Sequence, residues 1–448
     1  MTRSALSRRK FLGQTALATG ALIAAPYVRG AYAAGKLSVG FWDHWVPGAN
    51  DTLTKLCNEW AAKEKVDITI DYITSQGDKN ILTIAAEQQA RSGHDILQMP
   101  AWQPLDKAES LEPVNDIVEK LIAEHGKVSG AVEYLGKRDG KWVAVPATTG
   151  SQIKPPCGRI DLFKEFVGLD VTKMYPVGPP DKELADKWTW DTFLAAAEKC
   201  HKGGYPFGVG LGQTSDTVDA TGAVFASYGA TLVDQEGNIT VKSDAVKQVL
   251  EFYKKLAPFL PADTYAYDDA SNNKILIAGK SALIFNPPSA WSVAVRDNPK
   301  VAENCWTFAT PKGPKGRYAP GQPYFLGIWG FSPNKPAAKS LLSYISTRSA
   351  VEQLVKASNG YDLPSFANLL DFDTWKEVGP PKGTVYNYPP RGDQIVSLAA
   401  APAPPKIANQ IYTQATMPKM ISKVTQEGLS IDKAIDWAAS ELEGFMRT

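Results

Sequence analysis

Cysteine and histidine are scarce in this chain of 448 residues, with four of each. The cysteines form no C-x-x-C pair and the histidines show no metal-ligand spacing, so the sequence predicts neither a metal site nor a cofactor. Most of the thiols are expected to pack in the core. A single disulfide remains open, because spacing alone cannot pair the four residues, which are Cys57, Cys157, Cys200 and Cys305.

Catalytic signatures are also missing. The chain contains no G-x-S-x-G, no H-E-x-x-H and no phosphate-binding loop. A glycosidase needs two carboxylates at a set separation, but a chain with 47 acidic residues produces pairs such as Asp268–Asp269 by chance. The sequence therefore favours a protein that is not an enzyme, with a periplasmic carbohydrate-active enzyme as the weaker alternative.

Charge of one sign is not concentrated anywhere, and no long hydrophobic run follows the N-terminal segment. Lysine and arginine number 48 against 47 acids, which gives a net charge of +1. Without a basic block, nucleic acid is not an expected partner. No later apolar run reaches the roughly 20 residues of a membrane-spanning helix, so we expect the mature protein to be soluble.

Residues 1–33 are predicted to be an export signal. Paired arginines stand before Phe11 and Leu12, a short apolar stretch follows, and Ala31-Tyr32-Ala33 is an A-x-A cleavage site. The paired arginines resemble the bacterial twin-arginine signal. Cleavage near Ala33 would lower the net charge from +1 to −4, because five cations and no acids lie in this segment. We therefore predict a periplasmic protein, with a signal anchor as the weaker alternative.

Strand-like and helix-like patterns alternate in the first part of the mature chain. The pattern after Lys36 is apolar and short, whereas Leu53, Leu56 and Trp60 recur at helical spacing. The order strand, helix, strand, helix, strand predicts a parallel sheet with helices on its faces. The strands are expected over 36–42, 66–73 and 95–100, and the helices over 50–65 and 80–93.

Further elements follow along the chain. Asp139-Gly140 between two apolar runs predicts a hairpin turn. Thr189 is the expected N-cap of a helix that ends before Gly203. The remaining predictions are a helix over 244–260, a helix, turn and strand over 273–286, a strand over 324–333 and a mainly helical final hundred residues.

Five segments occur in a recognisable order: "SGHDILQM", "DGKWVAVP", "LFKEFVGLD" with "WTWDTFLAAAEK", "AGKSALIFNPPSAW" and "GIWGFSPN". Together, behind an export signal, they resemble the extracellular solute-binding proteins of bacterial ABC importers, in the sugar-binding group of the maltose-binding protein family. The chain departs from the family pattern at His94, where a proline is usual, and at "IKPPCGRIDLF", where "YN" is frequent.

The resemblance implies an α/β fold of two lobes, each a mostly parallel sheet flanked by helices, with ligand bound between them and hinge closure around it. It also implies a monomer that delivers its ligand to an ABC permease in the membrane. Crossings between the lobes are expected near 146–150 and 285–289 and after Pro333. The expected segments are 34–146 and 286–333 in lobe 1, and 147–285 and 334–448 in lobe 2.

The stretch "DHWVPGAND" after the first strand is the leading candidate for a ligand contact. A sugar ring stacks on an aromatic side chain, and its hydroxyls need fixed planar donors and acceptors. Ligands in open α/β sheets lie beyond the carboxyl ends of the strands. The candidate ligand-binding residues are Asp43, His44, Trp45, Gln76, Trp102, Asp216, Asp219, Asn286, Trp291, Trp329, Tyr361 and Arg391.

Each candidate also has a purely structural interpretation. Packing is favoured for Trp42, whereas stacking on ligand is favoured for Trp45, which lies in a loop. Trp102, Trp291 and Trp329 are as consistent with packing as with stacking. The polar candidates have turn formation or helix capping as alternatives; these are Gln76 and its neighbour Asp78, Asp216 and Asp219 in the loop before 223–228, and Asn286, Tyr361 and Arg391.

The sequence therefore predicts the substrate-binding component of an ABC importer that captures a carbohydrate, with an oligosaccharide or polyol favoured. The alternatives are binding proteins for other solutes. Polyamine binders use acids and aromatic rings, and ferric binders use paired tyrosines, of which Tyr265 and Tyr267 are a faint echo. Glycerol phosphate would need cations in the cleft, for which Arg391, Lys154 and Arg159 are the candidates.

Overall fold

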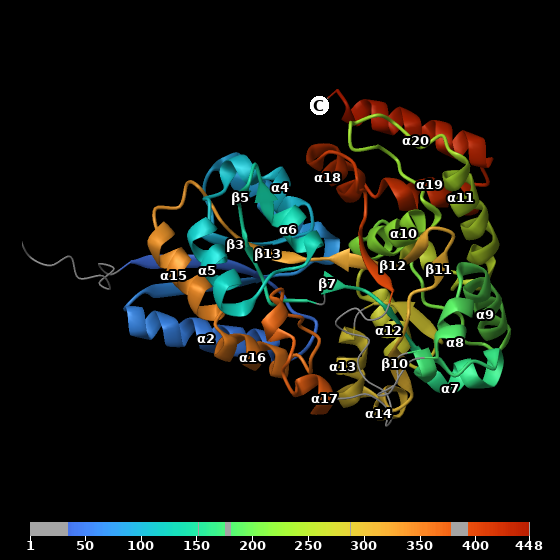
Figure 1. Cartoon of the computed structure of the whole chain (residues 1–448), viewed down its shortest axis with the longest axis horizontal. Helices are drawn as coiled ribbons and strands as arrows, with labels where there is room; N and C mark the ends of the chain where they lie inside the picture. Colours follow the sequence, from blue (N-terminus) through green and yellow to red (C-terminus); the bar gives the residue numbers. More distant parts are fainter. Residues whose placement is uncertain (1–34, 151, 175–180, 287, 378–392, 448) are drawn as a thin grey trace, which may run out of the picture.

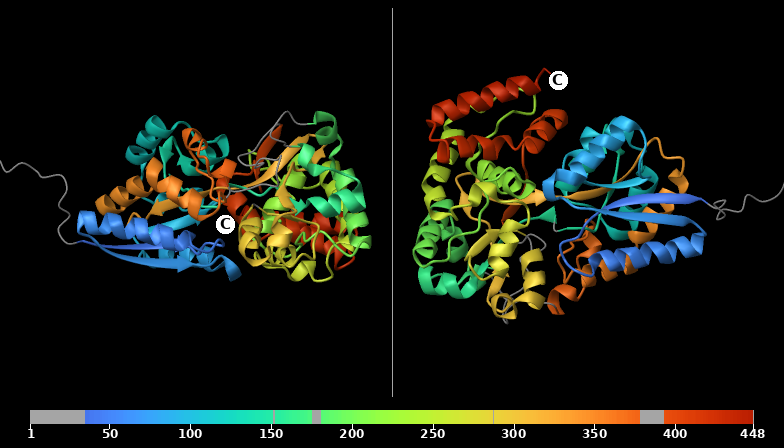
Figure 2. Two further views of the ribbon diagram at one scale, coloured as in Figure 1. Left: turned by 90° about the horizontal axis from the view of Figure 1, so that it is seen from below. Right: turned by 180° about the vertical axis from the view of Figure 1, so that it is seen from behind.

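The chain folds into two lobes joined by strands in the middle of the molecule (Figure 1). This computed structural model describes residues 35–150, 152–174, 181–286, 288–377 and 393–447. The predicted export signal lies outside the described residues. Two further directions of view show the same division into lobes (Figure 2). No helix in the described ranges has the length and hydropathy that a membrane crossing needs.

Lobe 1 is built on a five-stranded sheet in the order β2-β1-β3-β13-β6. The first three strands are parallel, as predicted, and β13 and β6 add antiparallel neighbours. The carboxyl ends of β1 and β3 meet at one edge, which brings the segments after Trp42 and after Pro100 together. The strands are β1 Lys36–Trp42, β2 Asp67–Ile73, β3 Ile96–Pro100, β6 Val145–Pro146 and β13 Tyr324–Ile328.

Amphipathic helices cover this sheet. In α2 the side chains of Leu56, Cys57 and Trp60 are buried, and this helical spacing was readable from the sequence. The Asp139-Gly140 turn joins β4 and β5 as predicted, with both residues at positive φ. The elements are α2 Ala49–Glu64, α3 Lys79–Ala90, α4 Gln103–Asp106, α5 Asn115–His125, α6 Gly130–Gly136, β4 Lys137–Arg138, β5 Lys141–Trp142, α15 Lys335–Ile345 and α16 Arg348–Ala357.

Lobe 2 holds two smaller sheets. One has the order β10-β8-β9, and the other has the order β11-β12-β14 with β7 paired to β12. The strands are β7 Gln152–Ile153, β8 Pro156–Arg159, β9 Leu283–Phe285, β10 Cys305–Thr307, β11 Lys312–Gly313, β12 Gly316–Gln322 and β14 Gln394–Leu398. The main helices are α9 Trp190–Lys202, α10 Ser215–Tyr228, α11 Asp244–Leu256, α12 Ser271–Ile277, α13 Ser289–Asp297, α18 Pro405–Thr413, α19 Thr416–Thr425 and α20 Ile431–Phe445.

Sheet membership corrects the expected segments in two places. The second crossing, which returns the chain to lobe 1, comes between β12 and β13 and not near 285–289. After β9 the chain continues into α13 and then β10, which pairs with β8 in lobe 2. The first two long helices after Pro333, α15 and α16, are also not in lobe 2, whereas α18, α19 and α20 are. Helix α15 packs on α2 and α5, and α16 packs on α2, because consecutive elements usually stay adjacent.

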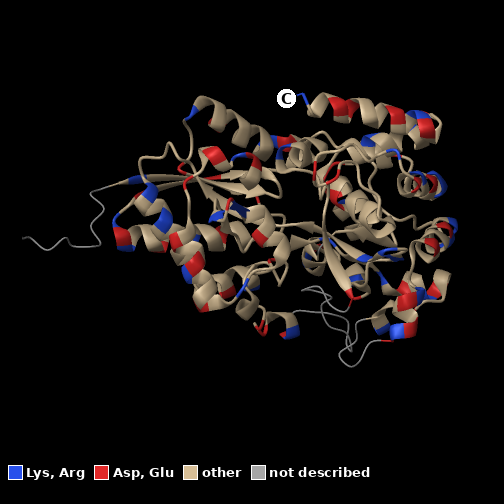
Figure 3. Ribbon diagram, turned by 45° about the horizontal axis from the view of Figure 1, so that its top comes forward, with Lys and Arg blue, Asp and Glu red and all other residues tan. Residues whose placement is uncertain are grey.

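Acidic and basic residues alternate over the outer helices of both lobes (Figure 3). Many form pairs one turn apart, such as Lys187 with Glu183 and Lys202 with Glu198. Exposed pairs of this kind contribute little to stability. The stability of the lobes therefore comes mainly from their buried cores and from capped helix ends.

Helix α9 begins at Thr189, the N-cap that its sequence predicts, and the structure adds a capping box with Thr192. The hydroxyl of Thr189 accepts a hydrogen bond from the backbone N–H of Thr192, and the Thr192 hydroxyl accepts one from the backbone N–H of Thr189. Two N–H groups that the helix itself cannot satisfy thus gain partners. The helix then buries Trp190, Phe193 and Ala197 in the lobe 2 core.

We predict that Thr189→Ala lowers the free energy of unfolding by about 1 kcal/mol, because the N-cap hydroxyl is lost. Chemical denaturation followed by circular dichroism measures this change. Ser440→Ala is the matched control: Ser440 is exposed inside α20 of the same lobe, and alanine favours a helix interior. Equal loss in both variants would contradict the assigned role of the cap.

Candidate functional site

A cavity lies between the two lobes, beside the strands that join them. Its volume is about 400 Å³. Lobe 1 contributes residues from the start of α3 and from α4, lobe 2 contributes the start of α10 and the inner face of α18, and the connecting strands supply Gln322 and Tyr324. Polar lining residues used below are Asp78, Gln103, Thr214, Asp269, Asn409 and Tyr412.

The connecting segments form a hydrogen-bonded unit. The backbone N–H of Ala147 donates to the Tyr324 carbonyl oxygen, 2.9 Å away, which joins two crossings side by side. Asp362 accepts a 2.6 Å hydrogen bond from the backbone N–H of Gly150, and its other contact is His44 Nε2 at 2.9 Å. The left-handed backbone at Gly150, with φ of 68°, suits glycine. His44 therefore fixes the hinge through Asp362.

Two tryptophans stand at the end of the first strand: Trp42 is the last residue of β1, and Trp45 lies in the loop that follows. Trp42 is buried and its ring stacks on Tyr324, with centroids 5.4 Å apart and an interplanar angle of 26°. Trp45 is half-buried and meets Trp42 edge-on at 6.1 Å. The Trp42 indole N–H also contacts the Ser75 hydroxyl at 3.4 Å. Trp42 therefore supports the cavity wall from behind, in agreement with the packing interpretation of its position.

A buried ion network lies beside the cavity in lobe 2. Lys154 Nζ lies 2.5 Å from Asp216 and 2.8 Å from Asp219, and all three side chains are largely excluded from solvent. Burial by itself lowers the pKa of Lys154, but the two carboxylates outweigh burial and raise it. Burial raises the pKa of Asp219 to about 6, although Lys154 acts in the opposite direction. Asp219 also accepts a 3.2 Å hydrogen bond from the Tyr412 hydroxyl.

The same network reaches the strand that precedes α13. Asn286 Nδ2 donates to Asn273 at 2.7 Å, and Asn272 Nδ2 donates to Asp216 at 2.9 Å. These amides hold Asp216 against Lys154. Asp216 and Asp219 lie on helix α10 and not in the loop that was expected, because Thr214 caps the helix one residue before Ser215.

Asp269 faces the cavity with few partners. Its carboxylate is 3.4 Å from the Ser215 hydroxyl and from the Asp216 backbone N–H. Burial, followed by the charge of Asp216, raises its pKa to about 7, and Asp78 from lobe 1 adds to this rise. An acid from each lobe therefore contributes negative charge to one cavity.

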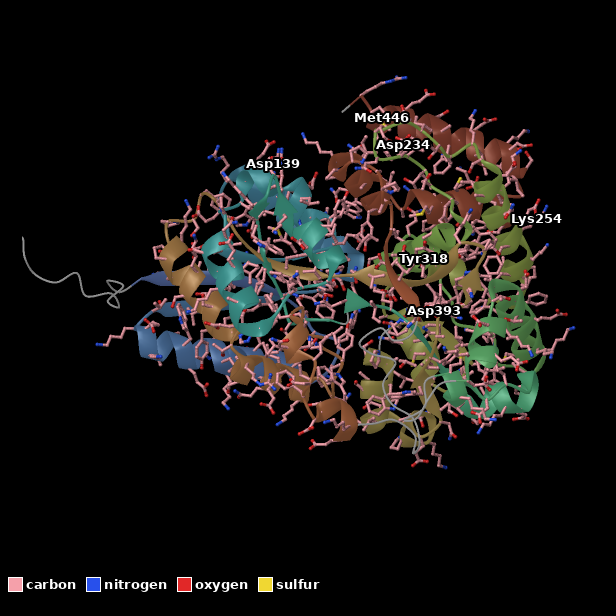
Figure 4. All side chains as sticks on the ribbon, viewed as in Figure 1. Asp139, Asp234, Lys254, Tyr318, Asp393 and Met446 are labelled. Carbon is pink, nitrogen blue, oxygen red and sulfur yellow. The ribbon has the colours of Figure 1, made fainter. Side chains whose placement is uncertain are left out.

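One side of the cavity is a direct contact between the lobes. The Trp102 indole N–H donates to the Ala399 carbonyl oxygen at 2.8 Å, and Gln103 Nε2 donates to Asn409 Oδ1 at 3.0 Å. Helix α4 of lobe 1 thus rests on α18 of lobe 2. A second, larger groove of about 1050 Å³ lies beyond this contact, flanked by Asp139 and Met446, which are labelled in Figure 4.

The structure brings some of the predicted site residues together and separates others. Asp216, Asp219 and Asn286 join the network beside the cavity, and Gln76 is exposed just before Asp78 at its rim. Asp43 is exposed and accepts a hydrogen bond from Asn50, while Tyr361 is buried edge-on to His44. Arg391 lies outside the described residues.

Three tryptophans that the sequence left open between packing and stacking, Trp102, Trp291 and Trp329, are buried outside the residues that line the cavity. Trp102 is 1% exposed and bonds to lobe 2 through its indole N–H. Trp329 is fully buried, and its indole N–H donates to Glu87. Trp291 packs edge-on against Trp306 at 5.3 Å.

Sequence reasoning missed Tyr324, Tyr412 and Gln103 as residues of the cavity lining. Tyr324 stands at a crossing that was expected elsewhere in the chain. Tyr412 shares the inner face of α18 with buried Ala408 and Ile411, so its spacing indicates packing alone. Gln103 follows a buried strand, at the edge of the sheet where ligands bind. This position could have marked it as a site residue, but only its neighbour Trp102 was predicted as a candidate.

The geometry described so far is that of a two-lobed binding protein with its site between the lobes. Residues 47–352 match the family model of the bacterial extracellular solute-binding proteins, and the chain belongs to this family. The predicted identification as an extracellular solute-binding protein is therefore confirmed. No curated protein matches the sequence.

Solved structures share the whole fold at low sequence identity. Maltose-bound MalE3 of Thermotoga maritima has a TM-score of 0.73 and 18% identity, covering 92% of this chain and 99% of that one. A solute-binding protein of Agrobacterium vitis with bound D-mannitol has a TM-score of 0.67 and 19% identity, again covering 92% and 99%. Such likeness confirms the predicted two-lobed α/β fold.

We predict that Lys154→Met lowers the free energy of unfolding by about 3–5 kcal/mol, because two buried carboxylates lose their shared cation. Chemical denaturation measures the loss. The double variant Lys154→Met/Asp219→Asn should recover part of it, since one of the stranded charges is removed. A loss below about 1 kcal/mol, typical of an exposed pair, would contradict the assignment.

A second prediction concerns pH. The pKa of Asp269 is about 7 in the folded protein, above its ordinary value of about 3.9. Between these values the folded state binds more protons than the unfolded state, so this group stabilises the fold at low pH and loses that effect as pH rises through 7. Asp269→Asn should therefore become more stable relative to the unmodified protein between pH 5 and pH 8.

Thermal and urea unfolding across this pH range measure the difference. Asp263→Asn is the control, because Asp263 is exposed in the same loop region and outside the cavity lining. A pH-independent difference for Asp269→Asn would show that Asp269 does not titrate in this window.

Proposed function

We propose that this protein is the substrate-binding component of a bacterial ABC importer, which captures a carbohydrate between its lobes and delivers it to a membrane permease. The observation that carries the proposal is the cavity between the lobes, where tyrosine rings and fixed polar side chains line one space. Solved relatives with the same fold hold maltose, D-mannitol and laminaribiose. These support a saccharide or polyol as the ligand class.

The lining offers the two kinds of contact that a sugar needs. Tyr324 and Tyr412 provide aromatic surface for the apolar face of a pyranose ring. Gln103, Asn409 and Thr214 provide donors and acceptors for hydroxyl groups. Gln103 and Asn409 bond to each other, so a sugar hydroxyl that binds either of them would exchange one hydrogen bond for another.

Capture needs no chemical step. A ligand that contacts both lobes binds the closed form more tightly than the open form and so shifts the population toward closure. The hinge unit around Gly150 and Asp362 would take up the change of angle, and the closed form would dock on the permease. The export signal over 1–33, a periplasmic location and a monomeric state complete the proposal.

A phosphorylated or ferric ligand has less support. Lys107 lines the cavity but is paired with Asp106, and Lys154 beside the cavity is shared by Asp216 and Asp219. Both cations are therefore already paired, which leaves neither of them free for a phosphate. In the part of the chain that the structure describes, no group of three or more histidine, cysteine, aspartate or glutamate side chains is arranged so that it could hold a metal ion.

The test is thermal unfolding of the purified protein against a panel of mono- and oligosaccharides, polyols, glycerol phosphates, polyamines and ferric citrate. A ligand that binds only the folded state raises the melting temperature with concentration. A shift with a saccharide or polyol is expected. A shift with glycerol phosphate or ferric citrate alone would contradict the proposal, and consumption of the sugar would indicate an enzyme.

We predict that Tyr412→Leu weakens binding of the saccharide found in this way by about 1–3 kcal/mol, as for buried aromatic anchors at interfaces. Isothermal titration calorimetry measures the loss. Tyr205→Leu is the matched control, because Tyr205 is a half-buried tyrosine of lobe 2 that packs on Phe166 outside the cavity. Equal affinity in Tyr412→Leu would exclude a stacking role for this ring.

A further inference from the structure

The charges that line the cavity are unbalanced. Three charged residues line it among those described, namely Asp78, Lys107 and Asp269. Lys107 is already paired with its neighbour Asp106 at 2.6 Å. Neither Asp78 nor Asp269 forms an ion pair with any cation of the described ranges. The remaining charge in the cavity is therefore negative and comes from both walls.

The two acids are not explained by local structure. Asp78 stands at the N-cap position of α3, but its side chain makes no capping hydrogen bond, so the capping alternative for this residue does not hold. Asp269 makes only long contacts of 3.4 Å. Asp78 is solvent-exposed at the rim of the cavity, whereas Asp269 is half-buried in its wall.

The buried network of Lys154, Asp216 and Asp219 lies beside the cavity without lining it, and it also has an excess of acids. Asp219 is 1% exposed, and its Oδ1 atom has no hydrogen-bond partner among the described residues. Lys154 must serve both Asp216 and Asp219. The network beside the cavity thus carries one more carboxylate than it has cations and keeps an unused buried acceptor.

From this arrangement we infer that the natural ligand is a saccharide that carries a protonated amino group, held between Asp78 of lobe 1 and Asp269 of lobe 2. The inference rests on the proposed function and narrows its substrate class. An ammonium group placed between the two acids would give each of the two carboxylates a positively charged hydrogen-bond donor. The sugar ring would occupy the remaining cavity beside Tyr324 and Tyr412.

The arrangement also couples charge to closure. When the lobes close on a neutral sugar, two like charges are brought into a space with less water, which opposes closure. An ammonium group between them replaces this repulsion by two attractions, and both are made fully only in the closed form. A cationic ligand therefore has the differential affinity that drives the population toward closure.

The test compares ligands that differ only in the amino group. Glucosamine and its β-1,4-linked dimer are titrated beside glucose and cellobiose by isothermal calorimetry at low salt. We expect the amino dimer to bind at least tenfold more tightly than cellobiose, and this ratio to fall as salt is added. Equal or tighter binding of cellobiose would overturn the inference while leaving the carbohydrate function intact.

Matched variants test whether Asp78 and Asp269 are the residues that favour the amino sugar over the neutral one. Asp78→Asn and Asp269→Asn should each bring the amino-to-neutral ratio toward one. Asp263→Asn, an exposed acid outside the cavity, should leave the ratio unchanged. Circular dichroism confirms that each variant is folded. An unchanged ratio in both cavity variants would overturn the assignment of these acids.

The number of protons released on binding tests direct contact with Asp269, because a purely structural role of this residue would not change its protonation when ligand binds. At pH 7 Asp269 is partly protonated in the free protein, and a bound ammonium favours its ionised form. Titrations in buffers of different ionisation enthalpy should show a fraction of a proton, at most about half, released with the amino dimer, none with cellobiose, and none in Asp269→Asn. Absence of release would contradict the contact with Asp269.

Two further outcomes separate this inference from the proposed function. Binding of spermidine with no saccharide bound would overturn the carbohydrate function, and with it the amino saccharide. Binding of Ca²⁺ alone would do the same and would identify the acids as a cation site.

Discussion

The shared ion pair of Lys154 with Asp216 and Asp219 is the contact on which the site depends. Lys154 follows β7, which pairs with β12 at the hinge, and both aspartates lie on the first turns of α10. The buried cation therefore ties a connecting strand to a helix of lobe 2. Its removal would leave two carboxylates stranded beside the cavity, and the surrounding amides of Asn272 and Asn286 could not neutralise them.

This constraint also organises the cavity walls. Because Tyr412 donates to Asp219, the inner face of α18 is held at a fixed distance from α10. Helix α18 in turn carries Asn409 to Gln103 of lobe 1. Polar side chains in the cavity are thus positioned by other polar side chains, which is the arrangement that a site of fixed shape requires.

The sequence was sufficient for elements whose pattern is local. The first three strands, the N-cap at Thr189 and the Asp139-Gly140 turn follow from periodicity, caps and turn chemistry, and all appear as predicted. The second lobe crossing was misplaced because β12 contains Pro320 and Gly321, which conceal a strand stabilised by partners distant in sequence. For the same reason the pairing of Lys154 with α10 could not be anticipated: it joins residues 62 and 65 positions apart.

The stacking of Trp42 on Tyr324 has an optical consequence. Tyr324 lines the cavity and Trp42 lies directly behind it, so this indole sits one ring away from any bound molecule. Most of the other tryptophans are locked into the cores of the lobes, where occupancy of the cavity does not alter their surroundings. The natural fluorescence of the unlabelled protein therefore carries a signal of the filled and empty states, to which Trp42 contributes from directly behind the cavity wall.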